Sequence, residues 1–224
     1  MCHHRAVTRE NFDRLFTVGS AAVLCGSHRT DVPPTPGSQR WGPSVCLRPD
    51  PQMAQTLAEM TDVAMEYAGP GHWPTGHSAS SHFTVRVLDE FRTDLTPAHR
   101  DVIGYLGAIR RAAARSDDIW LRVSGVTLAL GSVMAGAAPV DSCADTFAAA
   151  LAEELGAAGR HEAAFDRPFW YCNLIHFTGP ILAPGALVGW VGERRSLDLG
   201  LTSTRAELLD WSYDGAQMMP TVLG

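Results

Sequence analysis

The tripeptide His-Phe-Thr occurs twice in this chain, at residues 82–84 and 176–178. Each copy lies in a short apolar run, over residues 83–88 and 174–178, which is typical of a β-strand. Successive side chains on a strand point to opposite faces, so the histidine and threonine of each copy share one face and the phenylalanine takes the other. Two such strands can present two imidazoles and two hydroxyls to a single cleft.

One His-x-Thr on a strand carries little information, because a histidine on a sheet surface beside a threonine of high β-propensity explains it. Two identical copies are more informative, since a similar order of elements precedes each one. A strand over 44–47 and a helix over 51–68 are predicted before the first copy. Extended segments at 119–123 and 126–133 and a helix over 141–158 are predicted before the second.

The predicted elements mix helices and strands without a regular βαβ repeat, which favours an α+β fold. The further predictions are a helix over 96–115, a loop over 160–167, the second motif strand over 169–178, and strands at 196–202 and 207–213. Proline, glycine and small polar residues over 30–39 are typical of a linker. We therefore expect residues 1–40 to be a partly flexible N-terminal extension and residues 41–224 to form the domain.

Composition narrows the class of protein. A length of 224 residues suits one sizeable domain or two small lobes, and a net charge of −6 argues against a protein that coats nucleic acid. All 18 basic residues are arginine, which excludes a lysine nucleophile or Schiff base. The five scattered cysteines form no C-x-x-C pair and favour a reducing, cytoplasmic location. No apolar stretch predicts a membrane span, and Glu10 and Asp13 disfavour a signal peptide before the apolar run at 15–25.

The paired motifs resemble the signature of the 2H phosphoesterase superfamily, which includes RNA 2′-5′ ligase and cyclic phosphodiesterase (LigT-like) proteins. The similarity extends over about residues 41–224 and leaves out residues 1–40. The opening strand and helix of the family resemble Val45-Cys46-Leu47-Arg48-Pro49 and the helix that follows it. Its mid-chain strand resembles Ser124-Gly125-Val126, and its closing strands resemble residues 201–213.

The resemblance implies a bilobal α+β fold, in which two pseudo-symmetric antiparallel-sheet lobes with helices outside enclose a central cleft. It also implies catalysis without a metal or cofactor, by His82 and His176 as acid and base and by Thr84 and Thr178 as phosphate ligands. Histidine suits both roles because its ordinary pKa of about 6.5 allows one neutral and one protonated ring near pH 7. The residues do not assign which histidine is the base.

Three further residues are candidates for substrate binding. Arg86 follows His82 at i+4, so in a regular strand it shares that face and could bind phosphate; a solvated charge at the strand end is the alternative. Trp73 could stack on a base, or it could pack over the core as a loop aromatic. Tyr171 could border the cleft or belong to the core. No metal site is expected, because no helical or strand period brings His72, His77 and His82 together.

The second copy departs from the family pattern. Gly179 and Pro180 follow it, where the family usually has an aliphatic residue and often an arginine just beyond. A proline at this point ends or bends a strand. We expect the second copy to be where this protein differs from the family in what it binds.

The expected function is a metal-independent phosphodiesterase that opens 2′,3′-cyclic phosphates or cleaves 2′-5′ bonds. The expected partner is a nucleotide, an RNA-terminus phosphate or a small cyclic phosphate, acted on by a monomer. The acidic net charge favours small substrates over long RNA. The alternatives are a non-catalytic nucleotide- or RNA-binding protein, a pathway-specific enzyme for a small phosphate ester, and an unrelated α+β protein with two coincidental copies.

Overall fold

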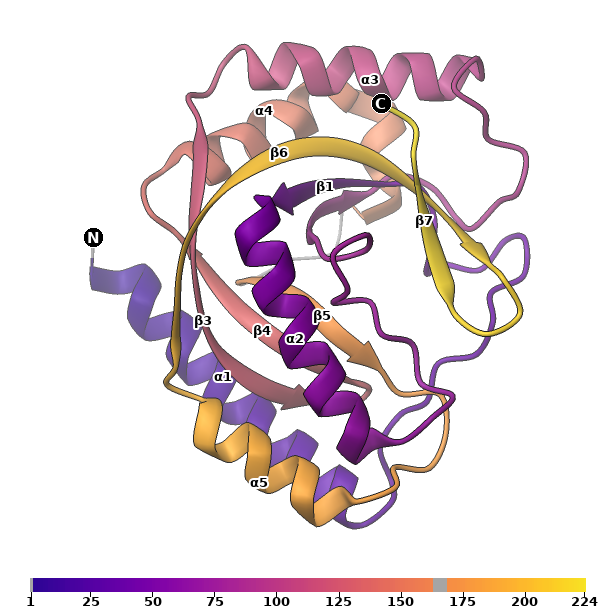
Figure 1. The fold of residues 1–224 in the computed structure, drawn as a ribbon. Helices are drawn as coiled ribbons and strands as arrows, with labels where there is room; N and C mark the ends of the chain where they lie inside the picture. The colour runs from indigo at the N-terminus through magenta and orange to yellow at the C-terminus, as the bar shows by residue number, and fades with distance from the viewer. Residues whose placement is uncertain (1, 163–168) are drawn as a thin grey trace.

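The structure, a computed structural model, describes residues 2–162 and 169–224, and Figure 1 shows its fold. In this part of the chain, antiparallel strands form one seven-stranded sheet in the order β2-β1-β6-β3-β4-β5, with β7 paired to the end of β6. The strands are β1 (Ser44–Pro49), β2 (Phe83–Val87), β3 (Ile119–Ala129), β4 (Ser132–Pro139), β5 (Trp170–His176), β6 (Asp198–Tyr213) and β7 (Met218–Val222). The helices are α1 (Cys2–Leu24), α2 (Pro51–Ala68), α3 (Arg100–Ala113), α4 (Cys143–Leu155) and α5 (Pro184–Arg194). The predicted α+β class is confirmed.

Strand β6 joins the two halves of the sheet. Its first half pairs with β3, its second half pairs with β1, and it arches across the whole molecule in Figure 1. The sheet curls into a half-barrel, so its two terminal strands, β2 and β5, approach each other. The buried thiol of Cys172 on β5 contacts the backbone of His82, just before β2. The two motifs therefore come together from opposite ends of one sheet.

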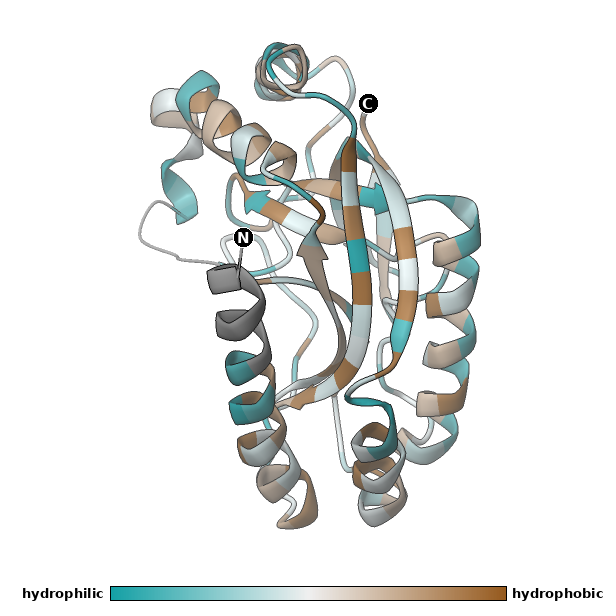
Figure 2. Ribbon diagram, turned by 90° about the vertical axis from the view of Figure 1, so that its left-hand side faces the viewer, coloured by the Kyte–Doolittle hydropathy of each residue, from teal (hydrophilic) through white to brown (hydrophobic). Residues whose placement is uncertain are grey.

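Helices cover the sheet on either side, as the turned view in Figure 2 shows. Helices α1 and α5 pack against β3, while α3 and α4 pack on each other over β6 and β3. Helix α2 lies against β5, β1 and β6. One continuous core runs between these layers and includes the fully buried Leu47, Phe83, Leu121, Phe147 and Phe177. Among the helices described, none combines the length and apolar character needed to span a membrane.

Helix α2 follows the sequence prediction closely. The carboxylate of Asp50 caps its N-terminus and accepts a hydrogen bond from the Met53 N–H at 3.0 Å, and Pro51 occupies the first turn. The same carboxylate accepts a hydrogen bond from the Thr202 hydroxyl at 2.8 Å, which ties the start of α2 to β6. Gly69, with a φ of 93°, ends the helix where other residues would be strained.

The N-terminal region differs from the prediction. The sequence predicts that residues 1–40 extend from a domain over 41–224, but α1 packs directly on β3. The contact is close because Gly19 has no side chain: a Cβ there would lie 2.4 Å from the Leu128 carbonyl oxygen. Val23 is 2% exposed and belongs to the core. Small residues let this helix approach the sheet closely. A contact of this kind cannot be predicted from the spacing of hydrophobic residues.

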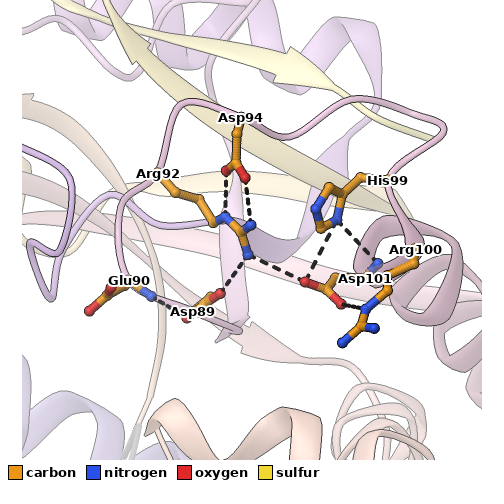
Figure 3. A network of polar contacts seen from close by, with 7 residues as sticks. All are labelled: Asp89, Glu90, Arg92, Asp94, His99, Arg100 and Asp101. Atoms are coloured by element: carbon orange, nitrogen blue, oxygen red, sulfur yellow. Dashed lines mark hydrogen bonds and ion pairs between the residues drawn. The ribbon is translucent and has the colours of Figure 1, made fainter.

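Several other boundaries also differ. Helix α3 begins at Arg100 with His99 as its cap, four residues after the predicted start. The loop before it folds around Arg92, whose guanidinium binds the carboxylates of Asp89, Asp94 and Asp101 (Figure 3). The two predicted C-terminal strands are the single strand β6, and α5 and β7 were not predicted. Of the loop predicted over 160–167, residues 160–162 belong to a 3-10 helix (Gly156–Glu162), and residues 163–167 lie outside the described residues.

Candidate functional site

Both motif histidines line one cavity of about 570 Å³. Its walls come from β2 and β5, from Trp211 on β6, and from the segment that joins α1 to β1, which we call the strap (residues 25–43). The residues that line it are Arg29, Gln39, Arg40, Trp41, Ser44, His82, Thr84, Val87, His161, Glu162, Tyr171, Asn173, His176 and Trp211. The prediction that one cleft receives both histidines is consistent with this geometry.

The first motif presents both of its polar side chains to the cavity. His82 is 9% exposed and donates its Nδ1–H to the Ser80 carbonyl oxygen at 2.7 Å, since a carbonyl only accepts. This contact assigns Nδ1 to the main chain, so Nε2 is the ring nitrogen suited to chemistry in the cavity. Thr84 follows two residues later on β2 and lines the same cavity. The alternation of a regular strand is preserved between the two residues.

A β-bulge immediately after this motif removes Arg86 from the site. In the pairing of β1 with β2, Cys46 opposes Thr84 and Val45 opposes Arg86, so Val85 is an extra residue. An extra residue reverses the alternation of all side chains beyond it. Val87 therefore lines the cavity, while Arg86 points away and donates to the Gly159 carbonyl oxygen at 2.9 Å. The prediction that Arg86 shares the face of His82 is wrong for this reason.

The second motif has its bulge before the histidine. In the pairing of β4 with β5, Met134 opposes Asn173 and Val133 opposes Ile175, which makes Leu174 the extra residue. Tyr171 and Asn173 face the cavity, and the bulge brings His176 to the same face three residues later. Tyr171 thus lies at the border of the cavity, which is one of the two positions that the sequence left open.

Thr178 does not line this cavity. Strand β5 ends at His176, and the Thr178 hydroxyl donates to the Gly71 carbonyl oxygen at 2.6 Å. The Thr178 N–H donates to Nδ1 of the buried His72 at 3.0 Å, and His72 in turn donates from Nε2 to the Ala68 carbonyl oxygen at 3.1 Å. The predicted role of Thr178 as a phosphate ligand in the cavity is not consistent with this geometry, because the chain bends away before the threonine.

Trp73 also lies outside the cavity wall. Its backbone exchanges two hydrogen bonds with His176, of 2.9 and 3.0 Å, and so forms a one-residue antiparallel bridge beside the end of β5. Its ring is 2% exposed and packs against Trp41 and Tyr213. Base stacking on Trp73, which the sequence allowed, is incompatible with this burial, and its alternative interpretation as a core aromatic is correct.

Asp31 belongs to this site, although no sequence pattern selects it. His176 is 6% exposed, and its Nδ1 lies 3.0 Å from Oδ2 of Asp31, itself 7% exposed. Arg40 forms an ion pair with the other oxygen of the same carboxylate. Asp31 lies among prolines in a segment with linker composition, and only the folded strap brings it to the second motif.

The electrostatics of this pair favour a neutral imidazole beside a carboxylate. Burial raises the pKa of Asp31, but its hydrogen bond with His176 and its ion pair with Arg40 outweigh burial and hold that pKa below its usual value. Burial lowers the pKa of His176, and the opposing effect of Asp31 does not fully compensate. His176 near neutral pH is therefore an uncharged ring that donates Nδ1–H to Asp31 and carries its lone pair on Nε2.

Aromatic rings connect the two histidines. The Trp41 ring centroid lies 4.8 Å from that of His176 and 5.3 Å from that of Trp211, and Trp211 lies 5.1 Å from His82. Trp41 has a φ of 69°, a left-handed conformation that is strained for a bulky residue and costs about 1–3 kcal/mol. The next residue, Gly42, must lack a side chain, because a Cβ would lie 1.9 Å from the Asp89 carbonyl oxygen. The packed strap thus holds the Trp41 indole against His176 and Trp211.

The remaining polar groups of the cavity suit an anion with hydroxyl or amine donors. Arg29 and Arg40 supply positive charge from the strap, and Glu162 accepts a hydrogen bond from the Val87 N–H at 2.8 Å. The side-chain oxygen of Asn173 is buried, with no hydrogen-bond partner among the residues described. Within the same residues, no three His, Cys, Asp or Glu side chains gather as a metal-binding group.

Comparison with known proteins identifies the fold. The structure is similar to the crystal structure of TT0787 of Thermus thermophilus, with a TM-score of 0.58 and 17% sequence identity, over 81% of this chain and 94% of that chain. A weaker match is ATU0111 from Agrobacterium tumefaciens, a conserved protein of unknown function, with a TM-score of 0.42 and 16% identity over 77% of this chain and 83% of that one. No family model and no curated protein matches the sequence. At these identities the similarity to TT0787 concerns the fold alone.

Proposed function

We propose that this protein is a phosphodiesterase that uses His82 and His176 as an acid–base pair. The observation that carries the proposal is that both imidazoles line one cavity of about 570 Å³ together with Arg29 and Arg40. Two histidines of suitable pKa on one phosphate can transfer both protons of a hydrolysis without a metal ion. Two nearby guanidinium groups can hold the phosphate oxygens.

The reaction is the opening of a 2′,3′-cyclic phosphate or the cleavage of a 2′-5′ phosphodiester. A neutral imidazole takes a proton from water while the water oxygen attacks phosphorus. The other imidazole, protonated at the start, gives its proton to the leaving ribose oxygen. The hydroxyl of Thr84 donates to a non-bridging oxygen, where negative charge grows in the transition state. With Thr178 turned to Gly71, the second contact to these oxygens falls to the arginines.

The proposal includes membership of the 2H phosphoesterase superfamily, which the paired motifs resemble. On this view the curled sheet divides into two lobes at β6, with one motif on the terminal strand of each lobe, β2 and β5. The similarity of fold to TT0787 is compatible with this assignment. The bulge after Thr84 and the early end of β5 are then features that distinguish this chain.

The substrate is proposed to be small. A cavity of about 570 Å³ lies in the usual range for small-molecule sites. Trp41 and Tyr171 offer aromatic surface to a base or sugar, and the unsatisfied oxygen of Asn173 can accept a hydrogen bond from a ribose hydroxyl or a base amine. A nucleoside 2′,3′-cyclic phosphate, an RNA end or another small cyclic phosphate has these groups.

The test is turnover of 2′,3′-cyclic AMP in the presence of EDTA by the full chain. We expect hydrolysis that survives chelation and that falls at least about a hundredfold in both His82→Ala and His176→Ala. His77→Ala is the matched control, because His77 lies at the surface on Asp62 and should leave the rate unchanged. Full activity in either motif variant would refute the two-histidine mechanism.

A second candidate function is nucleotide binding without turnover. The observation that favours it is the loss of Thr178 from the cavity, which leaves one hydroxyl where the family has two. Calorimetric titration with 2′,3′-cyclic AMP and 2′-AMP separates the candidates. Binding of both nucleotides with no hydrolysis over hours would support the binding protein and contradict the enzyme.

A further inference from the structure

The hydrogen bond between Asp31 and His176 joins two buried groups from distant parts of the chain. The Asp31 side chain is 5% exposed and that of His176 is 8% exposed, with Oδ2 and Nδ1 3.0 Å apart. A carboxylate that is ionised can only accept, so the proton between them belongs to Nδ1 of the imidazole. The other nitrogen of the ring, Nε2, is then the basic one, and the ring lines the cavity.

The strap holds Asp31 in place by main-chain contacts. The Asp31 N–H donates to the carbonyl oxygen of Phe177, the residue after His176, at 2.7 Å. The Phe177 N–H donates to the Gly131 carbonyl oxygen at 2.9 Å. Two residues earlier, the Arg29 N–H donates to the Leu130 carbonyl oxygen at 2.7 Å. The strap is thus bound both to the second motif and to the turn between β3 and β4.

We propose that Asp31 is the positioning residue that makes His176 the general base of the reaction. This inference rests on the proposed phosphodiesterase function and extends it in two ways: it assigns the two histidines, and it adds the strap to the active site. His82 has a neutral carbonyl as the acceptor on its Nδ1, whereas His176 has a carboxylate. The carboxylate stabilises the imidazolium that forms when the base takes a proton.

In the assigned step, His176 Nε2 removes a proton from water, the water oxygen bonds to phosphorus, and the bond from phosphorus to the ribose oxygen breaks. His82 gives the proton on its Nε2 to that ribose oxygen. The imidazolium of His176 keeps its Nδ1–H on Asp31, and Arg40 fixes the second oxygen of the carboxylate. The two rings then exchange protons with solvent to restore the resting state.

Other charged and titratable groups line the cavity beside the two rings. They are Arg29, Arg40, His161, Glu162 and Tyr171. Arg29 and Arg40 lower the pKa of His176 after burial has lowered it, and Asp31 raises it. Replacement of Asp31 by a neutral residue should therefore lower the pKa of His176 further.

The tautomer of His176 can be measured directly, without any substrate. In ¹⁵N-histidine NMR of the wild-type chain at pH 7.5, we expect a protonated Nδ1 and a lone-pair Nε2 for His176, assigned by loss of the signal in His176→Gln. A protonated Nε2 would overturn the inference. If the chain shows the expected tautomer but hydrolyses no cyclic phosphate, the hydrogen bond to Asp31 stands. The proposed function is then overturned, and the assignment of His176 as the base is overturned with it.

The matched pair Asp31→Asn and Asp62→Asn then tests the role in catalysis, since Asp62 binds His77 at the surface in a similar contact of 2.9 Å. For Asp31→Asn we expect kcat to fall at least about tenfold with a small change in KM. The acid limb of the pH profile of kcat/KM should move to lower pH, and Asp31→Glu should restore part of the rate. Asp62→Asn should do none of this. A lower melting temperature with an unmoved acid limb would show a purely structural role and overturn the inference.

Discussion

The two His-Phe-Thr copies have the same sequence, but their surroundings differ. In the first copy the bulge at Val85 follows the motif, so His82 and Thr84 both face the cavity. In the second copy the bulge at Leu174 precedes the motif and the strand ends at the histidine, so only His176 faces the cavity. The same three residues thus place an imidazole and a hydroxyl in the cavity in the first copy, and an imidazole alone in the second.

This comparison shows what an identical motif does and does not determine. Within three residues, alternation places histidine and threonine on one face only if the strand continues through both. The acceptors on the two rings also differ: Nδ1 of His176 is hydrogen-bonded to the Asp31 carboxylate of the strap, while Nδ1 of His82 donates to a main-chain carbonyl. The two histidines are therefore predicted to have different roles.

The largest expected effect separates the two threonines. Thr84→Val should lower kcat/KM about a hundredfold, because it removes a donor to the charge that develops on phosphate. Thr178→Val should change kcat/KM by less than about threefold and should instead cost about 1 kcal/mol of stability, from the lost hydrogen bond to Gly71. Kinetics on 2′,3′-cyclic AMP and urea unfolding measure the two effects. Equal losses of activity in both variants would mean that Thr178 reaches the phosphate after all.

An intermediate effect separates two arginines. Arg29 lines the cavity, and Arg86 is turned away from it by the bulge. Arg29→Gln should raise KM about tenfold with little change in kcat, as expected for the loss of one charge-assisted hydrogen bond to the substrate. Arg86→Gln should leave KM unchanged. Saturation kinetics at low and high salt test both variants, and a raised KM in Arg86→Gln would show that the bulge does not hold in solution.

The smallest expected effect concerns the pH dependence of stability around the second motif. Burial lowers the pKa of His72, so the unfolded chain binds this proton more readily than the folded chain does. Stability from this group is present above about pH 6.5 and is lost as the pH falls through the lower, folded value. In His72→Gln, whose amide can replace both hydrogen bonds without titrating, the melting temperature should fall less between pH 7 and pH 5 than in the wild type.

His77→Gln serves as the control for that series, since His77 lies in the same loop at the surface. Its melting temperature over the same pH range shows what the loss of an exposed histidine from this loop does by itself. A slope unchanged in His72→Gln would mean that protonation of His72 is not coupled to folding.

Local signals predicted much of the fold. The helix predicted over 51–68 matches α2, whose start is set by Asp50 and Pro51, because capping is a local property of the chain. The α+β class also followed from the order of elements. Helix α1 was missed because the close approach of Gly19 to Leu128 depends on a distant strand. The start of α3 was misplaced because the carboxylates around Arg92 shape the preceding loop through contacts that no residue pattern reports.

The site was predictable only in part, because strand bulges, strand ends and long-range contacts also decide which side chains reach it. The motifs select His82, His176 and Thr84, which line the cavity, and Tyr171 beside them. Arg86 and Thr178 were assigned by regular alternation, which a bulge and a strand end interrupt. Asp31 belongs to a region that resembles a linker, and its role depends on a contact across 145 residues. Main-chain irregularities and long-range contacts are properties of the folded chain.

The central claim is that the two histidines act as one unit on a single phosphate. The most direct test compares hydrolysis of 2′,3′-cyclic AMP by the wild type, His82→Ala, His176→Ala and the double variant. Residues that act together lose the same catalysis whether one or both are removed. We predict that the double variant retains the same residual rate as each single variant. Losses that multiply in the double variant would contradict a paired acid–base mechanism in one cavity.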